Sequence, residues 1–229
     1  MVKLGNWVFH NRNWFFAPLY VTMFIPSPAL TDNLNIQIGL GLAIFLFGVM
    51  SRGITIGLEY IVRGGLYRQI YADKLVTSGI YSICRNPMYF GNILILTGVG
   101  IFANSTLFVF LTIPVFVLLY AAIISAEQAF LENKFGEEYK LYRKNVNAII
   151  PDFTKIKKAF EGQEFNLKKV VRKEYNSFYL YLGGLLLLLI YQKHVSFVSF
   201  FIIGGILLVT YLTLRFLKKK NLLGSISCF

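Results

Sequence analysis

The chain has 229 residues, of which 56% are hydrophobic, 17% are aromatic and only 15% are charged. Because a soluble domain carries about 25% charged residues, this composition excludes an ordinary soluble globular protein and indicates an integral membrane protein. The formal net charge of +12 would by itself fit a nucleic-acid-binding protein, so the positions of the cations have to decide between the two classes.

Six apolar stretches are candidates for membrane-spanning helices, each of which needs roughly 20 mostly apolar residues. In chain order they are residues 14–28, 35–50, 89–103, 107–125, 177–191 and 196–217. The first contains three prolines, so we expect it to be kinked or partly interfacial, and the second could continue to residue 62. The sequence therefore predicts an all-α fold, a polytopic transmembrane helical bundle of about six spans.

The cations lie almost entirely in segments that six spans would put on one side of the membrane. Of the 23 Lys and Arg residues, all except Lys193 fall before the first span, between the second and third, between the fourth and fifth, or at the end of the chain. Cytoplasmic loops of membrane proteins carry such an excess. We therefore expect a multi-pass protein with both termini in the cytoplasm and no nucleic-acid partner. Cys84 and Cys228 would then lie on the cytoplasmic side, where disulfides are rare, so we expect both to be free thiols. We expect no cleaved leader, because the polar residues 10–13 precede aromatics and prolines.

Four segments follow from these patterns: N-terminal spans in residues 1–74, a central segment with polar motifs in residues 75–153, a basic cytoplasmic connector in residues 154–176, and a C-terminal pair of spans in residues 177–229. In residues 127–145, apolar positions recur every three to four residues, which predicts a cytoplasmic amphipathic helix. Residues 155–173 are rich in lysine and predict a solvated helix against anionic lipid headgroups. The last two spans could close a lipid-facing entrance or form a dimer contact, and their spacing favours neither.

Two polar motifs stand where the third span begins: Leu75-Val76-Thr77-Ser78-Gly79-Ile80-Tyr81 and Arg85-Asn86-Pro87-Met88-Tyr89-Phe90-Gly91. A first helical turn accepts proline, so we expect a helix to begin near Pro87. Its free N–H groups and the positive end of its dipole would then lie on the same side as Arg85. Such an arrangement is suited to binding an anionic group of a ligand.

Glu127 follows the fourth span at the depth where the helix leaves the lipid, and ionisable groups there are costly and tend to be functional. Since the third and fourth spans form a hairpin, Arg85 and Glu127 can face one pocket. Taken alone, Arg85 would more often set topology, Glu127 would be a helix-end charge, and Tyr81 and Tyr89 would belong to the interfacial aromatic belt. Their joint occurrence at this spacing favours a ligand site.

These motifs are joined by Glu127-Gln128, Phe135-Gly136-Glu137-Glu138-Tyr139, Tyr142 and Pro151. The set resembles the isoprenylcysteine carboxyl methyltransferase and phospholipid methyltransferase superfamily of integral membrane enzymes, over roughly residues 75–153. The resemblance implies an S-adenosylmethionine-dependent methyltransferase without a metal. It also implies that S-adenosylmethionine binds at the cytoplasmic membrane face and that a lipophilic acceptor enters from the lipid bilayer.

The resemblance assigns a cofactor-binding set, which consists of Ser78, Gly79, Ile80, Tyr81, Arg85, Asn86, Pro87, Tyr89, Gly91, Glu127 and Gln128. The turn at residues 78–81, the helix start and Arg85 would hold the carboxylate and amino group of the cofactor, and Gly79 and Gly91 would allow close backbone approach. Glu127 would accept from the ribose hydroxyls or an amino group. Arg85 and Glu127 are the expected catalytic residues, acting by positioning.

Three positions depart from the superfamily pattern. Asn86 stands where the family often has His, and Gln128 where it often has a second Glu, so hydrogen bonding is kept and charge is lost. Ile123 stands where the isoprenylcysteine enzymes have an arginine credited with the substrate carboxylate. A prenylcysteine carboxylate therefore lacks its partner here, unless Arg63, Arg68 or Arg143 reaches the site from elsewhere.

The sequence thus favours a lipid or other small hydrophobic acceptor. Prenylcysteine carboxyl O-methylation and phosphatidylethanolamine N-methylation stay open as alternatives among enzymes. Outside the enzymes, the alternative is a membrane scaffold or carrier that keeps the fold without turnover.

Overall fold

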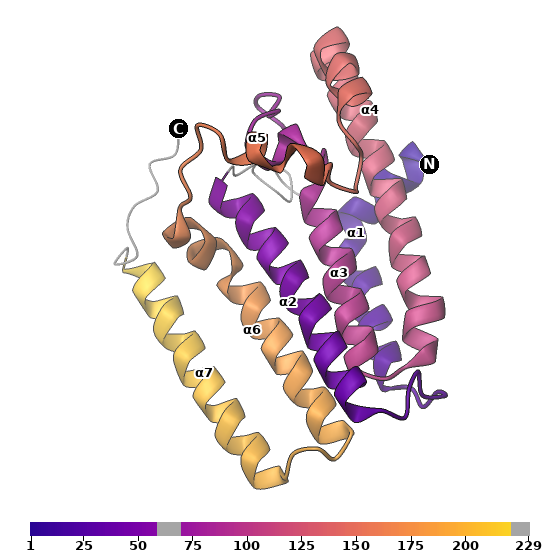
Figure 1. The fold of residues 1–229 in the computed structure, drawn as a ribbon, viewed down its shortest axis with the longest axis vertical. Helices are drawn as coiled ribbons and strands as arrows, with labels where there is room; N and C mark the ends of the chain where they lie inside the picture. The colour runs from indigo at the N-terminus through magenta and orange to yellow at the C-terminus, as the bar shows by residue number, and fades with distance from the viewer. Residues whose placement is uncertain (59–69, 221–229) are drawn as a thin grey trace. The chain divides into compact units, whose positions relative to one another are not determined.

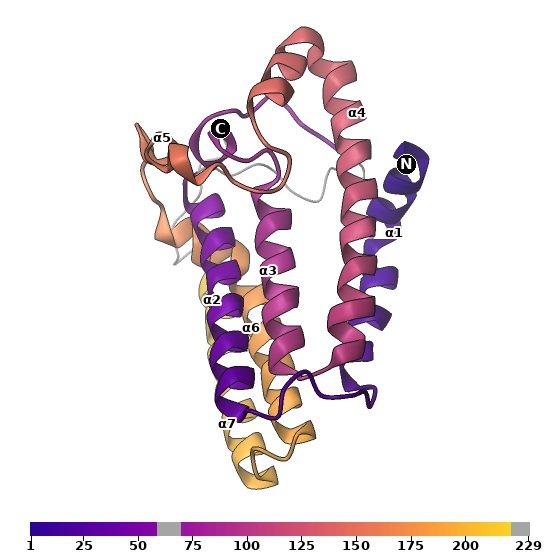
Figure 2. The same cartoon turned by 45° about the vertical axis from the view of Figure 1, so that its right-hand side comes forward.

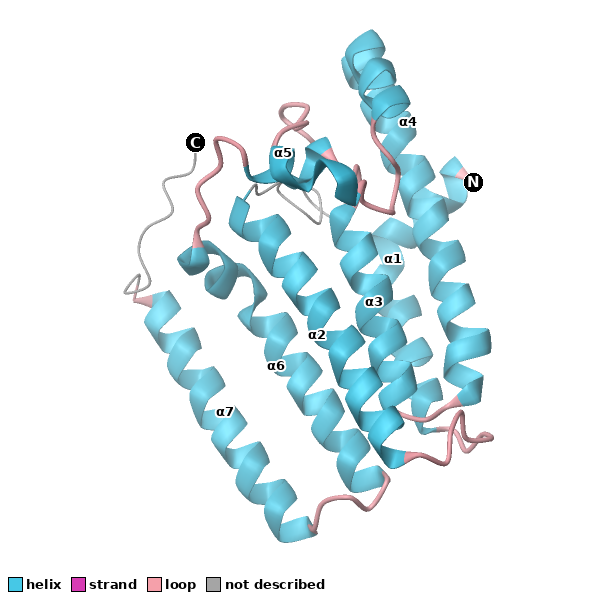
Figure 3. Cartoon of the chain, viewed as in Figure 1, coloured by secondary structure: helices cyan, strands magenta, loops and turns pink. Residues whose placement is uncertain are grey.

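The computed structural model describes residues 1–58 and 70–220, and every regular element within these ranges is helical (Figures 1 and 3). The longer helices are α1 (Val2–Val21), α2 (Leu34–Leu58), α3 (Pro87–Phe102), α4 (Ile113–Asn145), α6 (Leu167–Tyr191) and α7 (Phe197–Lys219). Shorter turns of helix are η1 (Thr22–Phe24), η2 (Gly79–Ser82), the π-helical η3 (Phe108–Thr112), η4 (Phe153–Lys155) and α5 (Ile156–Phe160). The predicted all-α class is confirmed for the described part of the chain.

The chain divides into two compact units, Met1–Glu164 and Phe165–Phe229. The second unit is the α6–α7 hairpin, in which the rings of Tyr175 and Tyr211 stack at 5.8 Å and the Lys218 ammonium lies 4.7 Å from the Tyr175 ring centre. The first unit holds α1 to α5 and all of the polar motifs. The finer division into four segments at residues 74, 153 and 176 stays a prediction.

Glycines allow two pairs of helices in the first unit to pack with their backbones in close contact. Gly41 and Gly48 of α2 face Gly98 and Gly91 of α3 so closely that a Cβ at Gly98 would lie 2.4 Å from the Phe45 backbone nitrogen. In the same way, a Cβ at Gly5 of α1 would lie 2.0 Å from the Ala122 carbonyl oxygen of α4. Figures 1 and 2 both show these two pairs, α2 beside α3 and α1 beside α4.

Three helical stretches among the described residues are long and apolar enough to cross a membrane: Leu34–Leu58, the continuous Phe108–Asn145, and Phe197–Lys219. These helices indicate an integral membrane protein, whereas the predicted count of about six spans is not confirmed. The apolar helix α3 has 16 residues, Pro87–Phe102, and is therefore shorter than a typical span. The two cytoplasmic termini stay a prediction.

Several helix boundaries differ from the predicted spans. Helix α1 covers Val2–Val21 rather than residues 14–28, so it includes the polar residues 10–13 and ends before the second proline. Helix α6 begins at Leu167 rather than at residue 177, because the Asn166 side chain accepts a hydrogen bond from the Lys169 N–H and caps the helix within the basic segment. Apolar content therefore predicted that these two helices exist, but not where they begin and end.

Two predicted cytoplasmic helices also take another form. The amphipathic stretch at residues 127–145 is the continuation of α4, interrupted at Gly136, where φ is 53° and ψ is −127°. The basic stretch at residues 155–173 contains the short helix α5, an irregular turn and the first residues of α6 rather than one helix.

At the end of the first unit opposite the polar motifs, the α1–α2 loop is fixed to the α3–α4 turn. The Asn104 side chain accepts from the backbone N–H groups of Leu30 and Thr31 at 2.8 and 3.1 Å and donates to the Thr31 carbonyl. Ser27 and Ser105 are joined through their hydroxyls at 3.1 Å. The two glycine-packed helix pairs are therefore tied together at this end.

We expect Gly98→Ala to lower the free energy of unfolding by about 1–3 kcal/mol, because the new methyl group would meet backbone atoms of α2 that cannot move aside. Thermal unfolding of the purified protein in detergent measures the effect. Gly39→Ala is the matched control, since nothing lies within 4 Å of its added Cβ and alanine favours a helix. Equal unfolding temperatures for the two variants would contradict the close α2–α3 contact.

Candidate functional site

The first polar motif forms the turn η2, which starts at Gly79 with a φ of +58°. Ser78 precedes it in an extended conformation and is exposed. Ile80 and Tyr81 are buried in a small apolar cluster with Ile83 and Ala159. Gly79 thus supplies a conformation that other residues rarely adopt, whereas Ile80 and Tyr81 anchor the turn through burial.

The second polar motif is held by a segment 60 residues further along the chain. The Arg85 N–H donates to the Asn147 carbonyl at 2.9 Å and its Nε to the Val146 carbonyl at 3.0 Å. The Asn86 amide donates to the Ala148 carbonyl at 2.9 Å. Residues 83–86 and 146–152 therefore form one hydrogen-bonded layer at the N-terminal end of α3. Pro87 occupies the first turn of that helix, as predicted.

Cys84 belongs to the same layer. Its side chain is fully buried, it is a free thiol as predicted, and Sγ lies 3.0 Å from the Ile149 carbonyl oxygen. The Asp152 N–H donates to the Ile83 carbonyl, while hydrogen bonds from Lys155 and Thr154 hold the pKa of the Asp152 carboxyl below its usual value. Cys228 lies outside the described residues.

Gly136 lets α4 reverse over the start of α3, as Figure 2 shows at the upper end of α4. Its positive φ with a ψ of −127° is a turn conformation that suits glycine. The reversal places the Tyr142 hydroxyl 2.7 Å from the Tyr81 carbonyl and the Tyr139 hydroxyl 3.4 Å from an Arg85 guanidinium nitrogen. In the motif Phe135-Gly136-x-x-Tyr139-x-x-Tyr142, the glycine thus turns the chain back and the two tyrosines hold the returning segment against Arg85 and Tyr81.

Helices α3 and α4 meet at a polar contact near the same end. The Tyr89 hydroxyl donates to the Glu127 carboxylate at 3.0 Å, and the Tyr89 and Tyr120 rings lie 5.1 Å apart. Arg85, just before α3, contacts the Tyr139 hydroxyl from the returning end of α4. The structure therefore gathers a guanidinium, a carboxylate and several phenol groups where the polar motifs lie.

Gly91 packs against α2 and is therefore not placed for the predicted close approach of its backbone to a ligand. A Cβ on Gly91 would lie 2.7 Å from the Arg52 Cγ and 3.1 Å from the Gly48 carbonyl oxygen, so Gly91 faces α2. Arg52 is only 9% exposed and donates to the Asn92 side chain. By sequence, Arg52 falls among the cations between the second and third predicted spans, whereas the structure places it inside α2.

The residues considered for a substrate carboxylate are now placed where the structure describes them. Ile123 is 1% exposed, so no cation occupies that position of α4. Arg143 pairs with Glu132 at 3.2 Å, and Arg63 and Arg68 lie outside the described residues. Gln128 is half-buried next to Glu127.

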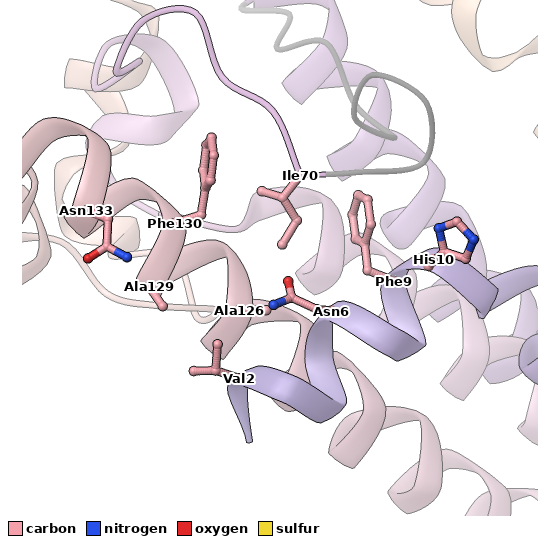
Figure 4. A pocket seen from close by; sticks show the side chains of 9 residues that line it. All are labelled: Val2, Asn6, Phe9, His10, Ile70, Ala126, Ala129, Phe130 and Asn133. Atoms are coloured by element: carbon pink, nitrogen blue, oxygen red, sulfur yellow. The ribbon is translucent and has the colours of Figure 1, made fainter.

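A cavity of about 550 Å³ lies between the N-terminal half of α1 and α4, beside the Glu127 segment (Figure 4). Its lining residues come from three segments and are Val2, Asn6, Phe9, His10, Ile70, Ala126, Ala129, Phe130 and Asn133. Sequence patterns did not predict it, because we had placed the first helix after residue 13. Within the described ranges, no group of three or more His, Cys, Asp and Glu side chains could hold a metal ion.

Comparison with known proteins gives a family and two relatives. The model of the phospholipid methyltransferase family matches residues 36–138, just under half of the chain, which confirms the resemblance predicted from the motifs. The cobalt-zinc-cadmium resistance protein CzcN of Cupriavidus metallidurans is 33% identical over 101 residues, 42% of this chain and 46% of the relative. The nickel-cobalt-cadmium resistance protein NccN of Alcaligenes xylosoxydans xylosoxydans is 30% identical over 101 residues, 42% of this chain and 47% of the relative.

The aligned part of this chain thus spans about half the length of the curated relatives that it matches. No solved structure matches the chain significantly.

We expect Gly136→Ala to destabilise the reversal of α4 by about 1–3 kcal/mol, because an alanine would be held in a backbone conformation that it rarely adopts. Hydrogen–deuterium exchange should then rise in residues 137–152. Gly183→Ala is the control, since both glycines have open space around the added Cβ and Gly183 has no positive φ. Unchanged exchange in Gly136→Ala would show that the conformation at Gly136 does not hold the layer.

Proposed function

We propose that this protein is an integral membrane methyltransferase that uses S-adenosylmethionine and acts on a lipid or other small hydrophobic acceptor at the cytoplasmic membrane face. The observation that carries the proposal is the Tyr89–Glu127 hydrogen bond of 3.0 Å, which joins two separate family motifs at the end of the unit where Arg85 is held. The family match over residues 36–138 supports the reaction class.

The residues at this end of α3 and α4 fit the chemistry of S-adenosylmethionine. Arg85 is a cation suited to the cofactor's carboxylate, and the Glu127 carboxylate is suited to its ribose hydroxyls or amino group. The rings of Tyr89 and Tyr120 offer π faces, which attract cations such as a sulfonium. The other residues proposed to contact the cofactor are Ser78, Gly79, Asn86, Pro87 and Gln128. Ile80 and Tyr81 anchor the turn η2 through burial.

The bound cofactor would supply an electrophilic methyl group. The contribution of the chain is then to position that group and the acceptor and to keep water out, which can account for a large part of a rate enhancement. Arg85 is suited to positioning because two backbone carbonyls and a tyrosine surround it through the layer of residues 146–152. Tyr89 orients the Glu127 carboxylate.

The acceptor class rests on what lies near the site. The buried Ile123 and the surface pair of Arg143 and Glu132 offer no described cation for a prenylcysteine carboxylate, which supports a lipid or another small hydrophobic acceptor. The names of the two relatives concern metal resistance and mention no methyl acceptor.

We expect Glu127→Gln to weaken binding of S-adenosylmethionine about 10- to 100-fold, since a hydrogen bond to a charged group contributes about 1.5–3 kcal/mol. Isothermal titration calorimetry of the purified protein measures the affinity, with S-adenosylhomocysteine as a second ligand. Glu137→Gln is the control, because this carboxylate of α4 is 88% exposed and pairs with Lys140. Absence of binding to the wild-type protein would overturn the cofactor proposal, and equal affinities would remove Glu127 from the site.

We expect cells that express the wild-type chain and are fed methionine with a heavy methyl group to accumulate a labelled product in lipid extracts, and Glu127→Gln to reduce it at least tenfold. Mass spectrometry of the lipid extracts and of the remaining protein fraction identifies the product. Label in ethanolamine headgroups would indicate phosphatidylethanolamine N-methylation, and label on prenylated protein would indicate carboxyl O-methylation. No labelled product in either fraction would favour a scaffold or carrier.

A further inference from the structure

The α6–α7 hairpin carries a strong positive charge at one of its two ends (Figure 1). Residues 165–229 contain nine Lys or Arg residues and a single acidic residue, Glu174. Only Lys193 belongs to the connection between the two helices. The other eight cations lie in the first two turns of α6 or around the C-terminal end of α7, and they are Lys168, Lys169, Arg172, Lys173, Arg215, Lys218, Lys219 and Lys220.

Four of these cations share a helix face with tyrosines. On α6, residues 168, 172, 175 and 179 recur every three to four positions, and on α7 residues 211, 215 and 218 do the same. Side chains with this spacing lie above one another on one face of a helix. The cations of these two faces are Lys168, Arg172, Arg215 and Lys218, and we name them the facing cations.

Ring contacts show that the two faces meet. The Tyr211 ring lies 5.8 Å from the Tyr175 ring, on which it stacks, and 5.5 Å from the Tyr179 ring. The Lys218 ammonium lies 4.7 Å from the Tyr175 ring centre and donates to the Arg172 carbonyl at 3.1 Å. The tyrosines therefore join the helices, and the facing cations lie at the open end of that joint.

The positive charge of this end is not balanced within the second unit. Glu174 directly precedes Tyr175 in the sequence, so it points about 100° away from the face that holds Arg172 and Tyr175. Like charges held on two joined helices repel each other. Because residues 221–229 contain no Lys, Arg, Asp or Glu, they do not change the charge of the unit. An anionic partner from outside the unit would lower this repulsion.

The surroundings of the facing cations indicate that this anion belongs to a lipid. Helix α7 is long and apolar enough to cross a membrane, none of its residues is buried, and its cations begin where the apolar run ends. Tyrosines of membrane helices are enriched at the level of the lipid headgroups. Clusters of four to eight Lys and Arg next to a spanning helix are typical of sites for anionic headgroups, and the guanidinium fork matches phosphate oxygens.

We propose that the facing cations bind the phosphate of an anionic phospholipid headgroup, with Arg172 and Arg215 as its principal hydrogen-bond donors. Tyr175 and Tyr211 hold the two helix ends together beneath the headgroup. The site lies outside residues 36–138, which the family model matches, and it does not depend on the proposed methyl transfer.

Native mass spectrometry of the full chain in a neutral detergent tests the site by titration with phosphatidylglycerol or with phosphatidylcholine of the same acyl chains. We expect phosphatidylglycerol to bind about tenfold more tightly, because the choline ammonium compensates the phosphate charge of the other lipid. Equal affinities for the two lipids would overturn the proposal. Equal affinity for soluble glycerol phosphate would assign the site to a free anion and would overturn the lipid proposal as well.

Arg172→Gln combined with Arg215→Gln should weaken the binding of phosphatidylglycerol about 10- to 30-fold, since each cation near an anionic headgroup contributes roughly a factor of five. Lys173→Gln combined with Lys220→Gln is the matched control. It removes two charges from the same helix ends but none from the facing cations, so we expect a loss of less than about threefold. Equal losses in the two double variants would show that only the total charge matters and would overturn the site.

Arg172→Lys combined with Arg215→Lys keeps both charges, and we expect it to bind phosphatidylglycerol within about threefold of the wild-type protein. Circular dichroism of every variant separates loss of lipid binding from loss of helix. A folded lysine variant that binds as weakly as the glutamine variant would contradict an electrostatic site. The lysine variant and the comparison of the two lipids also decide the matter if the glutamine variant does not fold.

Discussion

The polar end of the first unit depends on the hydrogen bonds between residues 83–86 and 146–152. They join segments more than 60 residues apart, so their formation closes a long loop that contains all of α3 and α4. Without them, Arg85 would be a flexible interfacial cation. With them, its guanidinium is fixed against the Val146 carbonyl, and the beginning of α3 has a defined environment. The reversal at Gly136 is the condition for this layer, because it turns the chain back toward Tyr81.

The polar motifs were the most predictable part of the molecule. The proline rule located the start of α3 at Pro87. Hairpin geometry predicted that Glu127 lies near the second polar motif, with Arg85 as the residue facing it, whereas the residue of that motif that Glu127 contacts in the structure is Tyr89. Helix ends were less predictable, because an amide cap at Asn166 and a polar first half of α1 extend helices beyond their apolar stretches. The pocket between α1 and α4 depends on that polar first half and could not be foreseen from hydropathy.

The sequence did not predict the role of each residue within the motifs, because a motif does not fix the direction in which a side chain points. Gly91 packs against Gly48 and Arg52 of α2, and Tyr81 is buried in an apolar cluster, although both stand beside residues proposed to bind the cofactor. The conformation of Gly136 had no sequence signal besides the glycine itself. Its consequence, the position of Tyr139 and Tyr142, appears only when the whole turn is known.

The contact between α3 and α4 differs in kind from the other helix contacts of the first unit. Helices α2 and α3, like α1 and α4, touch backbone to backbone at glycines, so separating either pair would open a cavity. Near the polar motifs, α3 and α4 meet through the Tyr89–Glu127 hydrogen bond and the ring contact of Tyr89 with Tyr120. The Tyr89–Glu127 bond involves a charged group and contributes about 1.5–3 kcal/mol, which a ligand hydroxyl that donates to Glu127 in place of Tyr89 can offset. Exchange of that bond would therefore leave the close glycine contacts of both helix pairs intact, so the polar end of α3 and α4 can change partners while the apolar helix packing stays as it is.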